Sequence, residues 1–129
     1  MVIRTLVFVA AGGASGAVAR YLLSNAVHAL VPMRFPLATL GVNLLGSLLI
    51  GILYVLIAER GVLHPEWRSV VMVGFLGAFT TFSTFSLEAV TLLEHGLGAQ
   101  ALAYIVASVV LCIGAAWAAI LLTRLVWTV

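Results

Sequence analysis

The centre of the third apolar segment reads GFLGAFTTFSTFS, from Gly74 to Ser86. Nineteen uncharged residues separate Arg68 from Glu88, about the length that an α-helix needs to cross a bilayer core. Within this span, two glycines are followed by five hydroxyl residues that alternate with phenylalanines. Glycine costs roughly 1 kcal/mol in a helix interior, and Thr and Ser offer the backbone competing hydrogen bonds. The composition therefore differs from that of a helix that only spans lipid.

Two interpretations of this stretch follow from the residues. In the first, the helix is interrupted near residues 77–81 at membrane depth, where freed backbone must be buried in protein or line a cavity. Its freed carbonyls could then hold a cation. In the second, the helix is continuous and its small residues allow close packing against other helices.

The composition of the whole chain indicates an integral membrane protein. Of its 129 residues, 64% are hydrophobic and 8% are charged, with a mean hydropathy of +1.28. The length leaves room for one domain, residues 1–129. The net charge of +2 comes from scattered arginines, which does not indicate a nucleic-acid partner. The single cysteine, Cys112, excludes a disulfide framework within the chain.

The hydrophobic pattern predicts an all-α membrane protein with four transmembrane helices. They cover about residues 2–30, 37–58, 66–94 (with the interruption near 77–81) and 99–127. Arg4, Arg60, Arg68 and Arg124 lie towards one side of this arrangement and Arg34 lies on the other, so the positive-inside rule favours one orientation.

Several polar residues fall inside the predicted spans, and each has two interpretations. Arg20 is either a structural arginine or part of a functional site, because an arginine at membrane depth is costly. Asn43 shares a helical stripe with Thr39 and Ser47, and it either joins helices or faces a pore. Glu88 either lies in a vestibule, where it could pair with Arg20, or marks the membrane interface.

The stretch around residue 80 resembles the Fluc (CrcB) family of microbial fluoride channels. It contains the family's Gly-Xaa2-Thr-Thr-Phe-Ser-Thr-Phe core, starting at Gly77. The family's Gly-Xaa3-Arg matches Gly16 and Arg20 in the first segment, and its Gly-Xaa-Asn-Xaa2-Gly places Asn43 in the second. The resemblance extends over all four segments.

The resemblance implies a passive fluoride-selective channel that exports fluoride through the cytoplasmic (inner) membrane of a bacterium. It implies an antiparallel, dual-topology homodimer with two pores and no organic cofactor. It also implies a structural sodium ion at the dimer interface, held by the backbone carbonyls of Gly77 and Thr80. Family members contact fluoride through the ring edges of two phenylalanines, which correspond to Phe82 and Phe85, and aromatic ring edges are positive.

The donors at membrane depth and the resemblance together define the expected site. Arg20 and Glu88 are placed at a possible vestibule. Cys112 departs from the family's hydroxyl track on the fourth helix, because a thiol is a weak donor. The residues expected along the anion path are Phe82, Phe85, Asn43, Ser108, Thr39, Tyr104, Ser83 and Thr84.

Other classes of protein fit the sequence less well than a channel does. No catalytic motif occurs, so an enzyme is not expected. A small multidrug-type transporter, which also works as an inverted dimer, would carry an acidic residue in its first helix, where this chain has Arg20. A structural subunit of a membrane complex would explain the small-residue surfaces but not an interrupted helix.

Overall fold

The structure is a computed structural model and describes residues 1–128. The described chain folds into long helices joined by short connections. In chain order these are α1 (Val2–Leu30), α2 (Leu37–Leu53), the π-helical η1 (Tyr54–Glu59), the π-helical η2 (Arg68–Leu76), α3 (Gly77–Phe79), α4 (Phe82–Glu94) and α5 (Gly98–Val126). η1 continues α2 without a gap, and η2 leads directly into α3.

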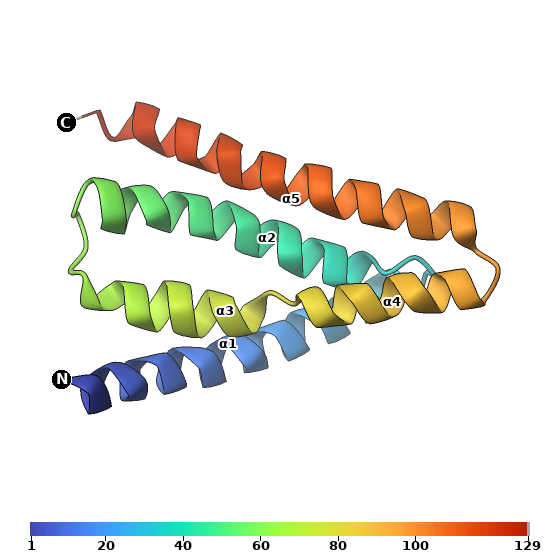
Figure 1. Cartoon of the computed structure of the whole chain (residues 1–129), viewed down its shortest axis with the longest axis horizontal. Coiled ribbons are helices and arrows are strands. Elements are labelled where there is room, and N and C mark those ends of the chain that lie inside the picture. Colours follow the sequence, from blue (N-terminus) through green and yellow to red (C-terminus); the bar gives the residue numbers. More distant parts are fainter. Residues whose placement is uncertain (129) are drawn as a thin grey trace.

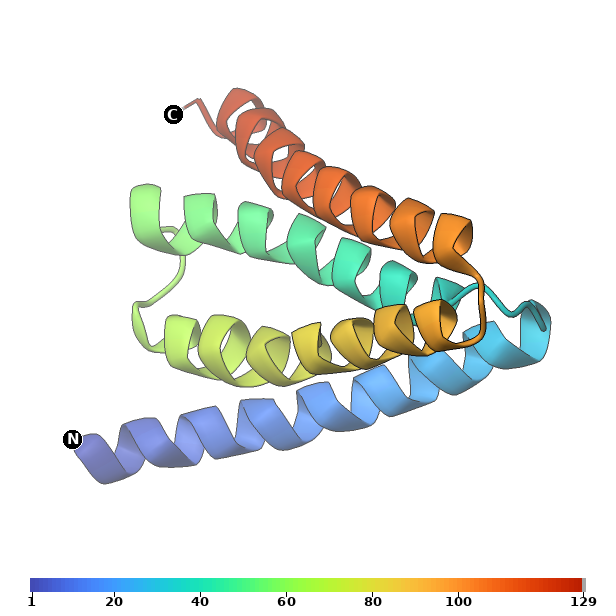
Figure 2. The same ribbon diagram turned by 45° about the vertical axis from the view of Figure 1, so that its right-hand side comes forward.

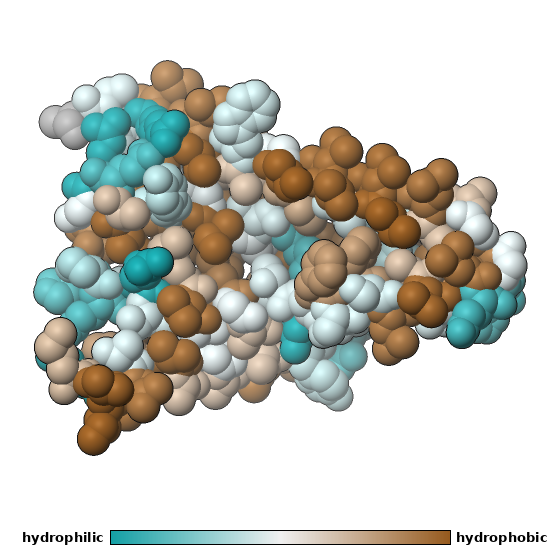
Figure 3. Space-filling model, viewed as in Figure 1, coloured by the Kyte–Doolittle hydropathy of each residue, from teal (hydrophilic) through white to brown (hydrophobic). Residues whose placement is uncertain are grey.

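Four stretches of helix are long and apolar enough to cross a membrane. They run over Val2–Leu30, Leu37–Glu59, Arg68–Glu94 and Gly98–Val126. This confirms the prediction of an all-helical chain with four apolar helices. Their mean hydropathies lie between 1.6 and 2.6, and large apolar side chains remain exposed along them. Figure 3 shows apolar surface over the helices and hydrophilic surface mainly towards the two ends of the molecule.

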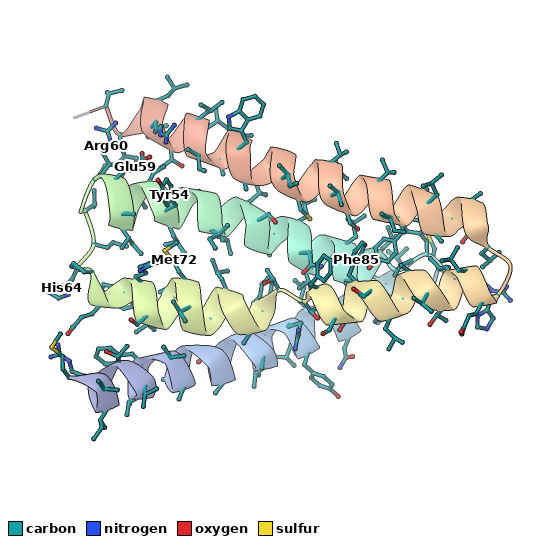
Figure 4. All side chains as sticks on the ribbon, in the orientation of Figure 1. Tyr54, Glu59, Arg60, His64, Met72 and Phe85 are labelled. Atoms are coloured by element: carbon teal, nitrogen blue, oxygen red, sulfur yellow. The ribbon has the colours of Figure 1, made fainter. Side chains whose placement is uncertain are left out.

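The helices lie side by side, with α1 and α5 at opposite edges. α2 and the η2–α3–α4 segment lie between them in both views (Figures 1 and 2). Both termini and the connection between η1 and η2 lie at the same end of the molecule (Figure 1). At this end Arg4 pairs with Glu66 of that connection, and Arg124 pairs with Glu59, the last residue of η1. Glu59 and Arg60 are labelled beside the end of α5 in Figure 4.

Glycines allow α1 to lie directly against the backbone of η2. A Cβ atom added at Gly74 would lie 2.7 Å from the Val9 carbonyl oxygen and 3.0 Å from the Gly13 amide nitrogen. A Cβ at Gly12 or Gly16 would also collide with η2 backbone. Gly12 and Gly16, which are four residues apart on α1, therefore form a close helix contact, as small residues do in membrane bundles.

α2 packs against α5 in the same way. A Cβ atom added at Gly51 would lie 2.6 Å from the Ala116 carbonyl oxygen and 2.8 Å from the Ala119 Cβ. Between the helices lie two clusters of buried side chains, one on each side of residues 80–81. The first contains Val42, Leu76 and Phe79; the second contains Phe85, Leu92, Ala101 and Tyr104.

α4 ends in a tight turn that needs a glycine. Gly96 has a φ angle of +73°, a left-handed conformation that costs glycine little. The Gly96 N–H donates to the Leu93 carbonyl at 3.1 Å, and the Leu97 N–H donates to the Leu92 carbonyl at 2.9 Å. This pair of bonds is the Schellman motif. It turns the chain into α5 and packs Leu97 on the second cluster.

The contact between α1 and η2 predicts a steric effect of substituting Gly16. Gly16→Ala would force these backbones apart, and overpacking of this kind costs about 1–3 kcal/mol. We expect a lower thermal unfolding midpoint in detergent. Gly98→Ala is the matched control, because nothing lies within 4 Å of a Cβ at that position. Equal melting of the two variants would contradict the close contact.

Candidate functional site

The backbone is extended at two residues between α3 and α4. Thr80 has φ −80° and ψ 156°, and Thr81 has φ −149° and ψ 113°. Neither residue is a glycine, and neither conformation is strained. Thr81 is the N-cap of α4, since its hydroxyl oxygen accepts a hydrogen bond from the Thr84 N–H at 3.2 Å. Threonine is a preferred residue at this position because it satisfies an otherwise unpaired donor.

Asn43 of α2 binds both backbone groups of Thr81. The Thr81 N–H donates to Asn43 Oδ1 at 2.7 Å, and Asn43 Nδ2 donates to the Thr81 carbonyl at 3.0 Å. A side-chain amide has the same donor and acceptor as a peptide group. Asn43 therefore replaces the helical hydrogen bonds that an extended residue loses. Ser47, on the same stripe, donates back to the Asn43 carbonyl at 2.7 Å.

Arg20 of α1 approaches the same two-residue link from the opposite side. Its Nη1 donates to the Thr80 carbonyl at 3.4 Å. Arg20 also lines a cavity of about 380 Å³, together with Tyr21, Ser24, Thr39, Thr81 and Thr84, among others. The charged group is therefore placed beside hydroxyl groups rather than among apolar side chains alone.

Glu88 does not meet Arg20 within this chain. Its Oε1 accepts a hydrogen bond from the Thr39 hydroxyl at 2.6 Å, and its Oε2 accepts one from the Tyr104 hydroxyl at 3.0 Å. Both hydroxyls thus donate to the carboxylate, each from a different helix. The sequence left open a pairing of Glu88 with Arg20. In the structure Glu88 binds Thr39 and Tyr104 instead.

The two phenylalanines at the start of α4 differ in exposure. Phe82 is 77% exposed and Phe85 is 8% exposed. Their ring centroids lie 5.4 Å apart, and Phe85 meets the Tyr104 ring edge-to-face at 5.1 Å. Figure 4 shows Phe85 directed from α4 towards α2 and α5. Phe82 instead presents its ring to the surface.

An open groove runs along the link between α3 and α4. Its volume is about 460 Å³. Polar groups on its wall come from Asn43, Ser47, Thr80, Thr81 and Ser108, and apolar groups come from Ile50, Met72, Leu76, Phe82, Phe85, Val109 and Ile113. Gly46, Gly77 and Cys112 complete the lining.

Ser108 lines this groove from α5 with a buried side chain. Its hydroxyl oxygen has no hydrogen-bond partner among residues 1–128. A buried hydroxyl without a partner costs free energy, so such a group is available to a ligand in the groove.

The groove gathers half of the residues expected along the anion path. Asn43, Ser108, Phe82 and Phe85 line it, together with Gly77 and Thr80, which were expected to bind sodium. Thr39 and Thr84 line the second cavity instead. Tyr104 is buried against Glu88, and the Ser83 hydroxyl lies 3.4 Å from that of Thr81.

Thr81 lies within the interruption expected from the sequence, but its role as the N-cap of α4 was not predicted. The signal was only partial, because threonine is a preferred N-cap residue but Thr84 stands where a capping box has Glu or Gln. Recognising it required the second helix to begin at Phe82, and apolar periodicity alone does not locate that boundary. No cluster of three His, Cys, Asp or Glu side chains exists within the described residues, so a cation here would depend on backbone and hydroxyl oxygens.

Comparison with known proteins identifies the family. The model of the family described as "CrcB-like protein, Camphor Resistance (CrcB)" matches residues 7–120. A protein of Hahella chejuensis is 54% identical over 121 residues, covering 94% of this chain and 95% of its own length. One of Saccharophagus degradans is 55% identical over 116 residues, covering 90% and 86%.

A third relative, from Stutzerimonas stutzeri, is 50% identical over 123 residues, covering 95% of this chain and 99% of its own length. All three relatives carry the name fluoride-specific ion channel FluC. The similarity includes every helix described above, since the family match begins in α1 and ends in α5. The chain belongs to the CrcB-like family.

Proposed function

We propose that this chain is a passive, fluoride-selective ion channel through which fluoride leaves the cytoplasm. Relatives that match almost the whole chain at about half identity are named fluoride-specific ion channels, and this similarity carries the proposal. The protein is accordingly a channel and not an enzyme. It is a multi-pass membrane protein, and we place it in the cytoplasmic (inner) membrane of a bacterium, in contact with lipid.

The groove provides the chemistry that a small anion needs. Fluoride is strongly hydrated, so a pore must replace lost water with closely spaced donors. Asn43 donates only one of its two N–H groups to Thr81, which leaves the other available. Ser108 contributes, from α5, a hydroxyl that has no hydrogen-bond partner among residues 1–128. Phe82 and Phe85 contribute ring edges, which are the positive part of an aromatic quadrupole.

The remaining residues of the anticipated anion path have supporting roles in this proposal. Thr39 and Tyr104 lie at the Glu88 carboxylate, and Ser83 and Thr84 surround the Thr81 hydroxyl. Arg20 is placed at the entrance to the path, where its charge attracts anions. The hydroxyls of Ser83 and Thr84 can rotate to donate to a passing ion, because a hydroxyl hydrogen is free to turn.

The channel is proposed to be an antiparallel homodimer in which the third transmembrane helix is interrupted at mid-membrane. Three features support this arrangement. The groove is open along the outside of one chain, polar groups border it, and Phe82 is exposed beside it. Polar groups facing lipid are costly, so a second copy would cover them. Twofold symmetry is the commonest way for two copies to do so.

A sodium ion is proposed to bind at the dimer interface through the backbone carbonyls of Gly77 and Thr80. Both residues line the groove, and no carboxylate does, which favours a monovalent ion. When bound, the ion would satisfy acceptors that converge from the two copies. Within each chain, Asn43 and Arg20 keep the neighbouring backbone in place.

The proposed function predicts uncoupled fluoride efflux. Purified protein in liposomes should release fluoride down its gradient without a coupling ion, while chloride in parallel vesicles stays inside. A small multidrug-type transporter would need a proton gradient and an organic substrate, and a structural subunit would release neither anion. Equal release of chloride and fluoride would contradict a selective channel.

The ring-edge role predicts that Phe82→Ile and Phe85→Ile lower fluoride efflux. Isoleucine keeps the hydrophobic character but lacks a positive ring edge. If this raises the free-energy barrier to fluoride permeation by about 1.4 kcal/mol, the efflux rate falls about tenfold. Phe8→Ile is the matched control, since Phe8 lines neither cavity. The variants are checked for assembly by size-exclusion chromatography. Parent-like efflux in both would remove the ring edges from the mechanism.

The proposed cation site predicts that sodium stabilises the assembled protein. A ligand at a hundred times its dissociation constant adds about 2.7 kcal/mol of stability. The thermal unfolding midpoint should therefore rise with sodium and not with N-methyl-D-glucamine at equal ionic strength. Thr80→Val should keep this response, because the Thr80 hydroxyl donates to the Leu76 carbonyl and is not the proposed ligand. Identical midpoints of the parent in the two salts would refute the site.

A further inference from the structure

We infer that Asn43 and Thr81 are positioning residues for the cation site. They divert two backbone N–H groups away from their usual acceptors, and this frees the carbonyls of Gly77 and Thr80. The inference rests on the proposed sodium site and goes beyond it, because it says which side chains of the same chain keep the two carbonyls free to bind the ion.

The Gly77 carbonyl has lost both of its helical donors. In an α-helix this carbonyl would accept from the N–H four residues later, that of Thr81. Here the Thr81 N–H donates to Asn43 Oδ1 at 2.7 Å. The N–H three residues later, that of Thr80, donates to the Leu76 carbonyl at 3.0 Å. Asn43 thus holds the donor that would otherwise close the helix over Gly77.

The Thr80 carbonyl is freed by a different side chain. Its usual donor would be the Thr84 N–H, but that group donates to the Thr81 hydroxyl at 3.2 Å. Arg20 Nη1 reaches the Thr80 carbonyl at 3.4 Å, the outer limit of a hydrogen bond. A carbonyl oxygen has two lone pairs, so one acceptor position remains for an ion.

The residues that divert the donors and those that carry the freed acceptors line one groove. Asn43, Gly77, Thr80 and Thr81 all line it. The Gly77 carbonyl has lost its helical donors, and an acceptor left unpaired away from water is costly. A cation would satisfy this carbonyl and could use the remaining lone pair of the Thr80 carbonyl. Without the diversion, the N–H groups of Thr81 and Thr84 could return to these carbonyls and compete with the ion.

Asn43 consequently belongs to both proposed sites. One N–H and the oxygen of its amide hold Thr81, and its second N–H is available to an anion in the same groove. The geometry of the cation site and the placement of an anion donor are therefore set by the same side chain.

The test measures the thermal unfolding midpoint of the detergent-purified protein at increasing sodium concentrations, with ionic strength kept constant by N-methyl-D-glucamine. The half-stabilising concentration is the sodium concentration that gives half of the maximal rise in this midpoint. Thr81→Val keeps the side-chain shape and removes the hydroxyl acceptor. We expect it to need about tenfold more sodium, a factor that corresponds to about 1.4 kcal/mol. Thr81→Ser restores the acceptor and should respond like the parent. Thr91→Val is the matched control, because the Thr91 hydroxyl donates only within α4, to the Leu87 carbonyl.

A purely structural role of Thr81 would give a different result. Loss of an N-cap alone would lower the unfolding midpoint at every sodium concentration and leave the half-stabilising concentration unchanged, which would overturn the inference. If Thr81→Val does not fold, Asn43→Ser takes its place, since serine is too short to bridge both Thr81 groups. It should show the same shift, and a parent-like sodium response would again overturn the inference.

The outcomes separate this inference from the function on which it rests. No sodium response in the parent would remove the cation site and the positioning roles together. Fluoride efflux from liposomes containing the parent would still decide the channel function independently. A parent that responds to sodium, with Thr81→Val unchanged, would remove only the positioning roles.

Discussion

The amide of Asn43 satisfies the backbone of Thr81, and the functional groove depends on this pairing. An extended residue between two helices exposes an N–H and a carbonyl that would otherwise be paired within the helix. Where water is scarce, each unpaired group costs several kcal/mol. One side chain from α2 supplies both partners, at 2.7 and 3.0 Å. The helix can therefore stop at Phe79 and restart at Phe82 without leaving the Thr81 backbone unsatisfied.

Close approach of the other helices makes this arrangement possible. Lipid does not drive helices together as water does, so dispersion contacts between small residues become important. Gly12, Gly16 and Gly74 bring α1 onto the backbone of η2, and this contact places Arg20 near the Thr80 carbonyl. Gly51 does the same for α2 and α5. The glycines thus set the distances at which the polar side chains can reach the link.

The polar side chains of the chain separate into two groups with different chemistry. Around Glu88, the hydroxyls of Thr39 and Tyr104 donate to a carboxylate, so their hydrogens are committed within the chain. In the groove, Ser108 is unpartnered among the described residues, and Asn43 retains an unused donor. An anion is attracted to free donors, so the groove is the better candidate for its path. This separation was not evident from the spacing of the residues, because Thr39 and Asn43 share one helical stripe and Tyr104 and Ser108 share another, yet the members of each pair belong to different groups.

The sequence by itself determined the four apolar helices, since their length and hydropathy leave no other way to satisfy the backbone in lipid. The motif that starts at Gly77 also indicated the family. Only the tertiary structure decided which partner each polar group takes. Asn43 and Glu88 each had more than one plausible partner, and the choice depends on distances between helices that are far apart in sequence. Local patterns carry no information on those distances, which close packing of glycine surfaces sets instead.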